Sequence, residues 1–248
     1  YSEVFHDAEK LDAYAMRLDD IGAFEAAGYE RDDIGKLSTY GCVLHEGVRQ
    51  LFEGISQGAF GGDLTRAVEG KTFLDLGSAE GRCVLSALMH FGGREGSPAL
   101  CRAVGVELSA LRHSLALRHL ARLRLPEARG RAVLIQGDIL SEESAGWIAE
   151  ADIIYAANLH FPEAVNERLG RLLEDRLDPA REVFVLALAP LGFVDCTSSG
   201  SEGDGRGPSA RRSPSSAWDI RVPMSWNPGG WPVRCYRFSA SSPADSAA

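Results

Sequence analysis

Apolar residues among the first sixty positions recur at the spacing of amphipathic helices. One predicted helical face carries Leu11, Tyr14, Ala15, Leu18 and Ile21. A second carries Leu44, Val48, Leu51, Phe52 and Ile55. Glycines follow both stretches, at 28 after the first and at 58, 61 and 62 after the second, and glycine commonly ends helices. The pattern predicts an N-terminal helical cap over residues 1–62.

From residue 71 onward, short apolar runs alternate with helical periodicity. The runs are Thr72–Leu76, Ala103–Val106, Ala132–Ile135, Asp152–Tyr155 and Glu182–Ala189. Strands with few polar positions are buried on both faces, and strands that alternate with helices are joined by crossovers. The alternation therefore predicts an α/β fold, with a mostly parallel sheet covered by helices on both faces.

Residues 197–216 break this pattern, because they are mostly Ser, Gly, Arg and Pro. Such a composition is typical of a flexible loop. Two more strand-like runs follow, Trp218–Val222 and Pro232–Phe238, on either side of Asn227–Gly230. Since Pro and Gly favour a turn between them, we expect a C-terminal antiparallel hairpin that closes the sheet.

Composition narrows the class of protein. The 248 residues can bury a substantial core, and 45% hydrophobic with 25% charged residues excludes a disordered or collagen-like chain. A net charge of −9 argues against general attraction to nucleic acid or anionic membranes. The chain has no apolar run of membrane-spanning length, and its polar, acidic start predicts no signal peptide. We expect no membrane partner.

Two compositional details concern partners and metals. Basic residues gather with the single acid Glu127 in one stretch: Arg112, His113, Arg118, His119, Arg122, Arg124, Arg129 and Arg131. This Arg-rich patch is interpreted either as a weak DNA contact or as a solvated helix face enriched by arginine-biased coding.

The five cysteines are scattered without C-x-x-C or C-x-x-H spacing. That argues against a metal site and a disulfide framework, and favours a reducing intracellular compartment.

The first predicted strand ends in Asp75, and Gly77 and Gly81 follow in an acid-x-G-x-x-x-G frame. In open α/β sheets, ligands bind at the carboxyl ends of the strands. The dinucleotide fingerprint G-x-G-x-x-G fails here, because Ala79 and Arg82 stand in its second and third glycine places. The frame is typical of S-adenosylmethionine methyltransferases, whose loop and following helix N-terminus face the amino-acid end of the cofactor. A positive φ at Ala79 would cost about 1 kcal/mol.

Acids also end the next two strands. Glu107 can accept hydrogen bonds from both ribose hydroxyls, and Asp138 can accept one from the adenine amine. Ile139 can pack on the adenine ring. Any one such acid is as easily a helix cap, but three acids at successive strand ends are hard to obtain by accident. The series predicts S-adenosylmethionine as cofactor and a methyltransferase domain over residues 63–248.

Four stretches carry a more specific pattern: Thr39–Gly41 with Glu46–Val48, Asp75–Gly81, Gly137–Glu143, and Ser225–Trp226 with Pro232–Val233 and Tyr236. Together they resemble the disruptor-of-telomeric-silencing type of histone-lysine methyltransferase. The resemblance implies a Rossmann-like class I methyltransferase with a mostly parallel seven-stranded sheet. It also implies a core-histone lysine in the nucleosome as substrate, and the nucleus as location.

The resemblance also implies residue roles. The cofactor-binding residues would be Tyr40, Gly41, Asp75, Gly77, Gly81, Arg82, Glu107, Asp138 and Ile139. Residues 155–161 would line a channel for the target lysine. The residues expected to carry catalysis are Asn158, Phe161 and Tyr236.

The chain departs from the family in three places. Cys42 stands where the family has Glu after Tyr-Gly, Ala157 stands where it has Asn, and Cys235 precedes Tyr236 where it has an aromatic pair. A one-residue shift would let Asn158 replace the missing asparagine. The departures leave open a methyltransferase for a non-histone protein or small molecule, or a cofactor-binding scaffold without turnover. If the protein does not act in the nucleus, we expect it in the cytoplasm.

Overall fold

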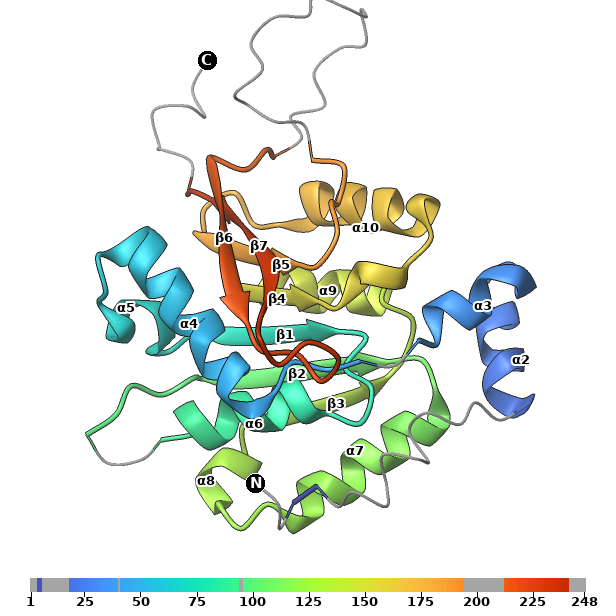
Figure 1. Cartoon of the computed structure of the whole chain (residues 1–248), viewed down its shortest axis with the longest axis horizontal. Coiled ribbons are helices and arrows are strands. Elements are labelled where there is room, and N and C mark those ends of the chain that lie inside the picture. The colour runs from blue at the N-terminus through green and yellow to red at the C-terminus, as the bar shows by residue number, and fades with distance from the viewer. Residues whose placement is uncertain (1–3, 6–17, 40, 94–95, 194–211, 241–248) are drawn as a thin grey trace, which may run out of the picture.

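The computed structural model describes residues 4–5, 18–39, 41–93, 96–193 and 212–240 (Figure 1). Its centre is a seven-stranded sheet in the order β3-β2-β1-β4-β5-β7-β6. The strands are β1 (Thr72–Leu76), β2 (Arg102–Glu107), β3 (Ala132–Gln136), β4 (Ile153–Ala156), β5 (Val183–Ala187), β6 (Ser216–Val222) and β7 (Trp231–Phe238). β1 to β5 pair in parallel, and β7 pairs antiparallel with both β5 and β6. This confirms the predicted Rossmann-like class I methyltransferase fold with a C-terminal hairpin.

Helices cover both faces of the sheet. They are α2 (Leu18–Ala26), α3 (Arg31–Leu37), α4 (His45–Phe60), α5 (Leu64–Val68), α6 (Arg82–Phe91), α7 (Ala110–Arg122), α8 (Pro126–Arg129), α9 (Glu142–Glu150) and α10 (Glu163–Arg176), with a short 3₁₀ turn η1 (Asn158–His160). One core cluster joins α4 and α6 to one face of the sheet, and the other joins α9 and α10 to the opposite face. Among the described residues, no helix has both the length and the apolar character needed to span a membrane.

Helix α4 belongs to the main core, because its buried side chains Val48 and Phe52 share a cluster with Phe73 of β1. It continues through Gly58 and is capped by Gly61 in the left-handed conformation, so of the glycines expected to end it Gly61 does and Gly58 does not. The reason is close packing: a Cβ at Gly58 would lie 2.3 Å from the Trp218 ring of β6. Glycine at this position lets the edge strand approach the helix backbone.

Helices α2 and α3 form a smaller unit at one side of the sheet, near α7 (Figure 1). Phe24, Tyr29 and Ile34 bury their side chains together with Val165 of α10. This third cluster meets one of the main core clusters only through the partly buried Leu140 and Phe161. The division into a cap of residues 1–62 and a domain of residues 63–248 stays a prediction. Of the predicted flexible loop, residues 197–211 lie outside the described residues, and Ser216 already belongs to β6.

Candidate functional site

The loop after β1 is built by backbone conformations that side chains disfavour. Gly77 and Gly81 have φ values of 84° and 77°, and Gly81 is the N-cap of α6. The backbone N–H groups of Gly77 and Ser78 both donate to the carbonyl of Val106 in β2, each at 2.9 Å. The loop is thereby fixed over the carboxyl ends of β1 and β2, where the sequence predicts the cofactor.

Ala79 adopts a positive φ of 47°, the conformation in which an alanine costs about 1 kcal/mol, and it is the only described non-glycine residue to do so. Its backbone N–H donates to Glu107 Oε2 at 2.8 Å. A charge-assisted hydrogen bond of this kind offsets a backbone strain of about 1 kcal/mol. The strand-end acid of β2 therefore holds the glycine loop in shape.

Glu107 is buried, and its other oxygen accepts the backbone N–H of Ser109 at 2.8 Å. A carboxylate oxygen has two lone pairs, so each oxygen keeps one acceptor position for a ribose hydroxyl. Burial raises the pKa of Glu107, while the Arg112 guanidinium and the N–H groups of Ser109 and Ala79 oppose that rise. Arg112 lines the same cleft, whereas the sequence analysis placed it in the Arg-rich patch, interpreted as a weak DNA contact or a solvated helix face.

Asp138 follows β3, and its Oδ1 accepts the Tyr29 hydroxyl at 2.6 Å and the backbone N–H of Leu140 at 3.0 Å. Burial and this hydrogen bond raise the pKa of Tyr29, so the phenol stays protonated and donates. Sequence reasoning missed Tyr29, which lies 109 residues away in the loop between α2 and α3. The sequence shows a tyrosine after the first amphipathic helix, but the spacing of residues does not predict that Tyr29 contacts Asp138.

These residues enclose a cleft with an empty volume of about 640 Å³. The cleft is lined by Phe24, Tyr29, Leu37, Thr39, Gly41, Gly77, Ala79, Glu107, Leu108, Arg112, Asp138, Ile139, Ala157 and Phe161. Polar acceptors and apolar walls therefore face the same space. The third hydrophobic cluster, carried mainly by α2 and α3, forms the wall beside Asp138.

A smaller cleft of about 320 Å³ adjoins the first, and Gly41, Gly77, Ala79 and Ala157 line both. Asp75 lies in this second part, and burial, with the neighbouring Glu107, raises its pKa to about 8. Arg82 also lines it, with an ion pair to Glu80 and its guanidinium 4.5 Å from the Phe5 ring centroid. The predicted cofactor residues therefore divide between two connected ends of one site.

The segment after Gly41 is joined to the tip of the β6–β7 hairpin. Cys42 donates its N–H to Ser225 Oγ at 3.1 Å, and the Ser225 N–H donates back to the Cys42 carbonyl at 2.9 Å. A Cβ on Gly41 would lie 2.4 Å from the ring of Trp226, which stays 42% exposed. Tyr40 was predicted to cover the cofactor and lies outside the described residues.

Two of the three residues expected to carry catalysis lie elsewhere. Asn158 is fully buried, its Nδ2 donating to Asn166 Oδ1 and its Oδ1 accepting the N–H groups of Leu188 and Ala189. It anchors the end of β5, and Ala157 lines the cleft instead. The expected one-residue shift that would bring Asn158 into the site does not occur, because the 3₁₀ turn η1 directs its side chain inward.

Tyr236 is the second displaced residue. Its ring lies 4.8 Å from that of Phe193, centroid to centroid, and it lines a separate hollow beside β5 and β7. Cys235, its neighbour, points to the opposite face of the sheet and is buried in the core with Tyr155. Phe161 is the member of the trio that lines the cofactor cleft.

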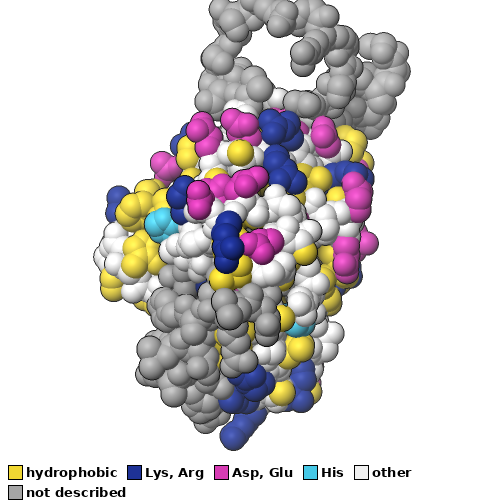
Figure 2. Space-filling model, turned by 90° about the vertical axis from the view of Figure 1, so that its right-hand side faces the viewer, with side chains coloured by type: hydrophobic (Ala, Val, Ile, Leu, Met, Phe, Trp, Pro, Cys, Tyr) yellow, Lys and Arg dark blue, Asp and Glu magenta, His cyan; other side chains and the backbone are white. Residues whose placement is uncertain are grey.

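The Arg-rich patch is smaller than its sequence suggested. Arg112 donates to the Ser38 carbonyl, and His119 is fully buried with Nδ1 3.0 Å from the Glu80 carbonyl. Arg129 and Arg131 donate to backbone carbonyls of nearby loops. Figure 2 shows Lys and Arg side chains gathered at the lower end of the face in view. Arg112, Arg129 and Arg131 of the patch therefore stabilise nearby backbone segments.

The polar groups of the site suit S-adenosylmethionine. Glu107 and Asp138 can each accept a further hydrogen bond, which suits the ribose and the adenine. Asp75, beside the buried Tyr155 hydroxyl, suits a charged amino-acid end. Among the described residues, no three His, Cys, Asp or Glu side chains gather as a metal site.

Comparisons with known proteins show what the chain is similar to. No family model matches the chain. Over 171 residues it is 28% identical to "Histone-lysine N-methyltransferase, H3 lysine-79 specific" from two strains of Cryptococcus neoformans var. neoformans serotype D. The match covers 64% of this chain, and the chain spans 23% of the length of these relatives.

Solved structures of methyltransferases also resemble the chain. TrmN from Thermus thermophilus has 17% identity and a TM-score of 0.45, over 77% of this chain and 48% of that one. The glycopeptide N-methyltransferase MtfA in complex with S-adenosyl-L-methionine has 16% identity and a TM-score of 0.37, over 72% and 68%. The strand order is that of the class I S-adenosylmethionine-dependent methyltransferase fold, and the cleft lies at the carboxyl ends of its parallel strands.

Proposed function

We propose that the chain is a protein-lysine methyltransferase that uses S-adenosylmethionine and acts on a core-histone lysine in the nucleosome. The observation that carries this proposal is the 171-residue similarity to enzymes specific for lysine 79 of histone H3. The Gly137–Glu143 and Ser225–Trp226 stretches also support it, because a generic methyltransferase does not need them. The proposal places the protein in the nucleus.

The reaction sets one main requirement for the protein. S-adenosylmethionine supplies, when bound, a methyl group on a sulfonium, and the attacking lysine amine must be neutral. With an ordinary lysine pKa near 10.4, deprotonation at pH 7 costs about 4–5 kcal/mol. Apolar surroundings reduce this cost, because they disfavour the ammonium form. Ala157 and Phe161 supply such surroundings at the cleft, and proximity and alignment supply much of the remaining acceleration.

The roles proposed for the cofactor-binding residues follow their positions. Glu107 would accept from the ribose hydroxyls, and Asp138 from the adenine amine with Ile139 packed on the ring. Asp75 and Arg82 would face the amino-acid end. Gly77 and Gly81 would give the loop its shape, and Tyr40 and Gly41 would cover the site. Asn158 and Tyr236 would support the target side only through packing, because neither lines the cleft.

The direct test is methyl transfer from labelled S-adenosylmethionine to nucleosomes and to free histones. We expect label on histone H3 in nucleosomes, lost when lysine 79 is replaced by arginine. The Glu107→Ala variant is the matched control, because it removes a cofactor-holding carboxylate outside the target channel. Absence of label on every histone would overturn the histone substrate.

A second candidate function is favoured by the target side of the cleft. Ala157 offers no amide there, and Cys235 is buried. A methyltransferase for a non-histone protein or a small molecule would label a broader substrate panel but no histone. A scaffold without turnover would bind S-adenosylmethionine in calorimetry and label nothing.

A further inference from the structure

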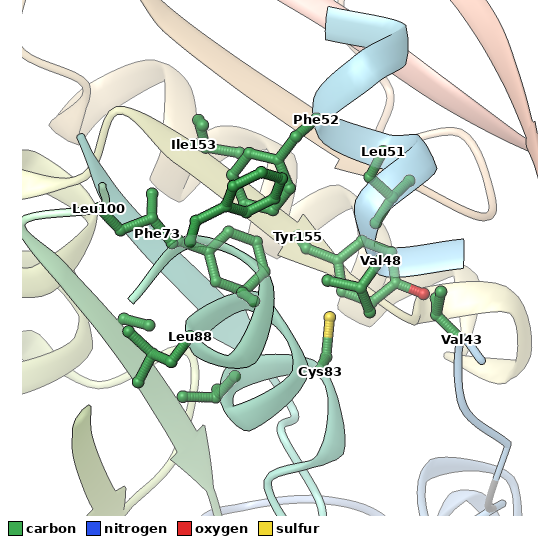
Figure 3. Close-up of a cluster of buried hydrophobic side chains, with 14 of the residues drawn as sticks. Val43, Val48, Leu51, Phe52, Phe73, Cys83, Leu88, Leu100, Ile153 and Tyr155 are labelled. Atoms are coloured by element: carbon green, nitrogen blue, oxygen red, sulfur yellow. The ribbon is translucent and has the colours of Figure 1, made fainter. Parts of the chain in front are cut away.

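The smaller end of the cleft contains a buried hydroxyl that no role above uses. Tyr155 lies in β4 directly beside Asp75 of β1, and the two are paired in the parallel register. Its side chain is only 2% exposed and packs in the core with Val48 and Cys83. Figure 3 shows its hydroxyl oxygen directed toward Val43, in the segment that covers the cleft.

The Tyr155 oxygen is buried and has no hydrogen-bond partner among the described residues. A buried hydroxyl without a partner costs about 1–3 kcal/mol, and phenylalanine would fill the same space without that cost. Burial also raises the pKa of Tyr155 well above its ordinary value, so the phenol remains neutral and keeps its proton. A protonated, unpartnered hydroxyl that lines a cleft is suited to a ligand that accepts a hydrogen bond.

The neighbouring group defines which part of the ligand reaches this end. Asp75 has no hydrogen-bond partner among the described residues, and burial raises its pKa in the empty cleft. A cationic ammonium bound beside it would lower that pKa again and pair with the carboxylate. In an α-amino acid the carboxylate is attached to the same carbon as the ammonium. A donor beside Asp75 is therefore correctly placed for the carboxylate when Asp75 takes the ammonium.

We propose that the Tyr155 hydroxyl binds the α-carboxylate of the cofactor's amino-acid end, while Asp75 binds the ammonium. This assignment rests on the proposed use of S-adenosylmethionine. It makes Tyr155 a recognition residue that distinguishes ligands with a carboxylate from ligands without one.

The test compares three ligands by calorimetry. They are S-adenosylmethionine, its decarboxylated analogue, which keeps the amine and the sulfonium, and 5′-methylthioadenosine, which lacks the whole amino-acid end. We expect the wild-type chain to prefer S-adenosylmethionine over the decarboxylated analogue by about tenfold or more, as for a hydrogen bond to a charged group. Tyr155→Phe should remove most of that preference and leave the affinity for 5′-methylthioadenosine unchanged.

Tyr29→Phe is the matched control, because it removes a hydroxyl from the Asp138 end. It should weaken all three ligands by a similar factor. Equal affinity of the wild-type chain for S-adenosylmethionine and its decarboxylated analogue would overturn the Tyr155 assignment, even if Tyr155→Phe did not fold. So would an unchanged preference in that variant. Failure to bind any of the three ligands would instead overturn the proposed function itself.

Discussion

The two ends of the cleft are built in opposite ways. At the adenosine end, Glu107 and Asp138 each accept two hydrogen bonds from the protein, from backbone N–H groups and from Tyr29. At the amino-acid end, Asp75 and the Tyr155 hydroxyl have no such partners among the described residues. The adenosine end is therefore held in shape by the protein, whereas the amino-acid end keeps polar atoms that no described residue satisfies.

The difference indicates how binding energy is divided. Groups already fixed by protein contacts lose little freedom when a ligand arrives, which favours affinity. Polar groups left without partners lower the stability of the empty protein and gain a full hydrogen bond on binding. The adenosine end should then determine whether a ligand binds, and the amino-acid end should determine which adenosyl ligand is preferred.

The largest effect should come from breaking the fixed end. Glu107→Ala removes the acceptor for the ribose and releases the N–H groups of Ala79 and Ser109. We expect S-adenosylmethionine binding to weaken by about 1–3 kcal/mol, measured by calorimetry. Glu107→Gln, which keeps one acceptor oxygen, should lose less. Equal affinities for the wild-type chain and both variants would contradict the ribose assignment.

A smaller effect should appear in the pH dependence of stability. The pKa of Asp75 is about 8 in the folded chain, against 3.8 for an ordinary aspartate, so the folded state binds this proton more tightly than the unfolded state. Its contribution to the free energy of unfolding must then fall as pH rises from about 4 to 8. Asp75→Asn removes this titration. We expect it to unfold at pH 8.5 with a free energy about 1–2 kcal/mol higher than wild type, and with a smaller difference at pH 5.

Urea unfolding at both pH values measures this change, and Asp32→Asn, at an exposed position of α3, is the control. If Asp75→Asn leaves the pH dependence of the free energy of unfolding unchanged, the Asp75 carboxyl ionises without cost in the folded chain. The same variant should bind S-adenosylmethionine more weakly, because it loses the charge that attracts the ammonium.

The smallest effect should come from relaxing the loop that joins the two ends. Ala79→Gly relieves a positive φ and keeps the N–H that Glu107 accepts. We expect a gain of about 0.5–1 kcal/mol in the free energy of unfolding. Ala145→Gly, in the middle of α9, is the control and should lose a similar amount. Loss of stability in Ala79→Gly would mean that the alanine methyl makes contacts worth more than the strain.

The parallel part of the sheet could be predicted from sequence because its strands are short apolar runs, most of them buried on both faces. Asp75, Glu107 and Asp138 lie at or just past the carboxyl ends of three of these strands. Those acids share one edge of a parallel sheet whatever the details of packing. The frame of two glycines also located the loop in which Ala79 has a positive φ, although the sequence left that φ open.

Side-chain direction just past a strand could not be predicted in this way. Ala157 and Asn158 are adjacent, and one turn of 3₁₀ helix decides that the first lines the cleft and the second is buried. Tyr29 and Arg112 were missed as site residues because only tertiary contacts bring them to Asp138 and Glu107. Helical periodicity identifies the faces of a helix but not which face meets a ligand.

The hydrogen bonds between Cys42 and Ser225 join segments 183 residues apart, and the adjacent Val43 and Met224 form a β-bridge. The residues from Gly41 to Val43, which line the smaller part of the cleft, are therefore hydrogen-bonded to the hairpin tip and packed against it. The hairpin supports the cleft wall from outside, although no described residue of β6 or β7 lines the cleft itself.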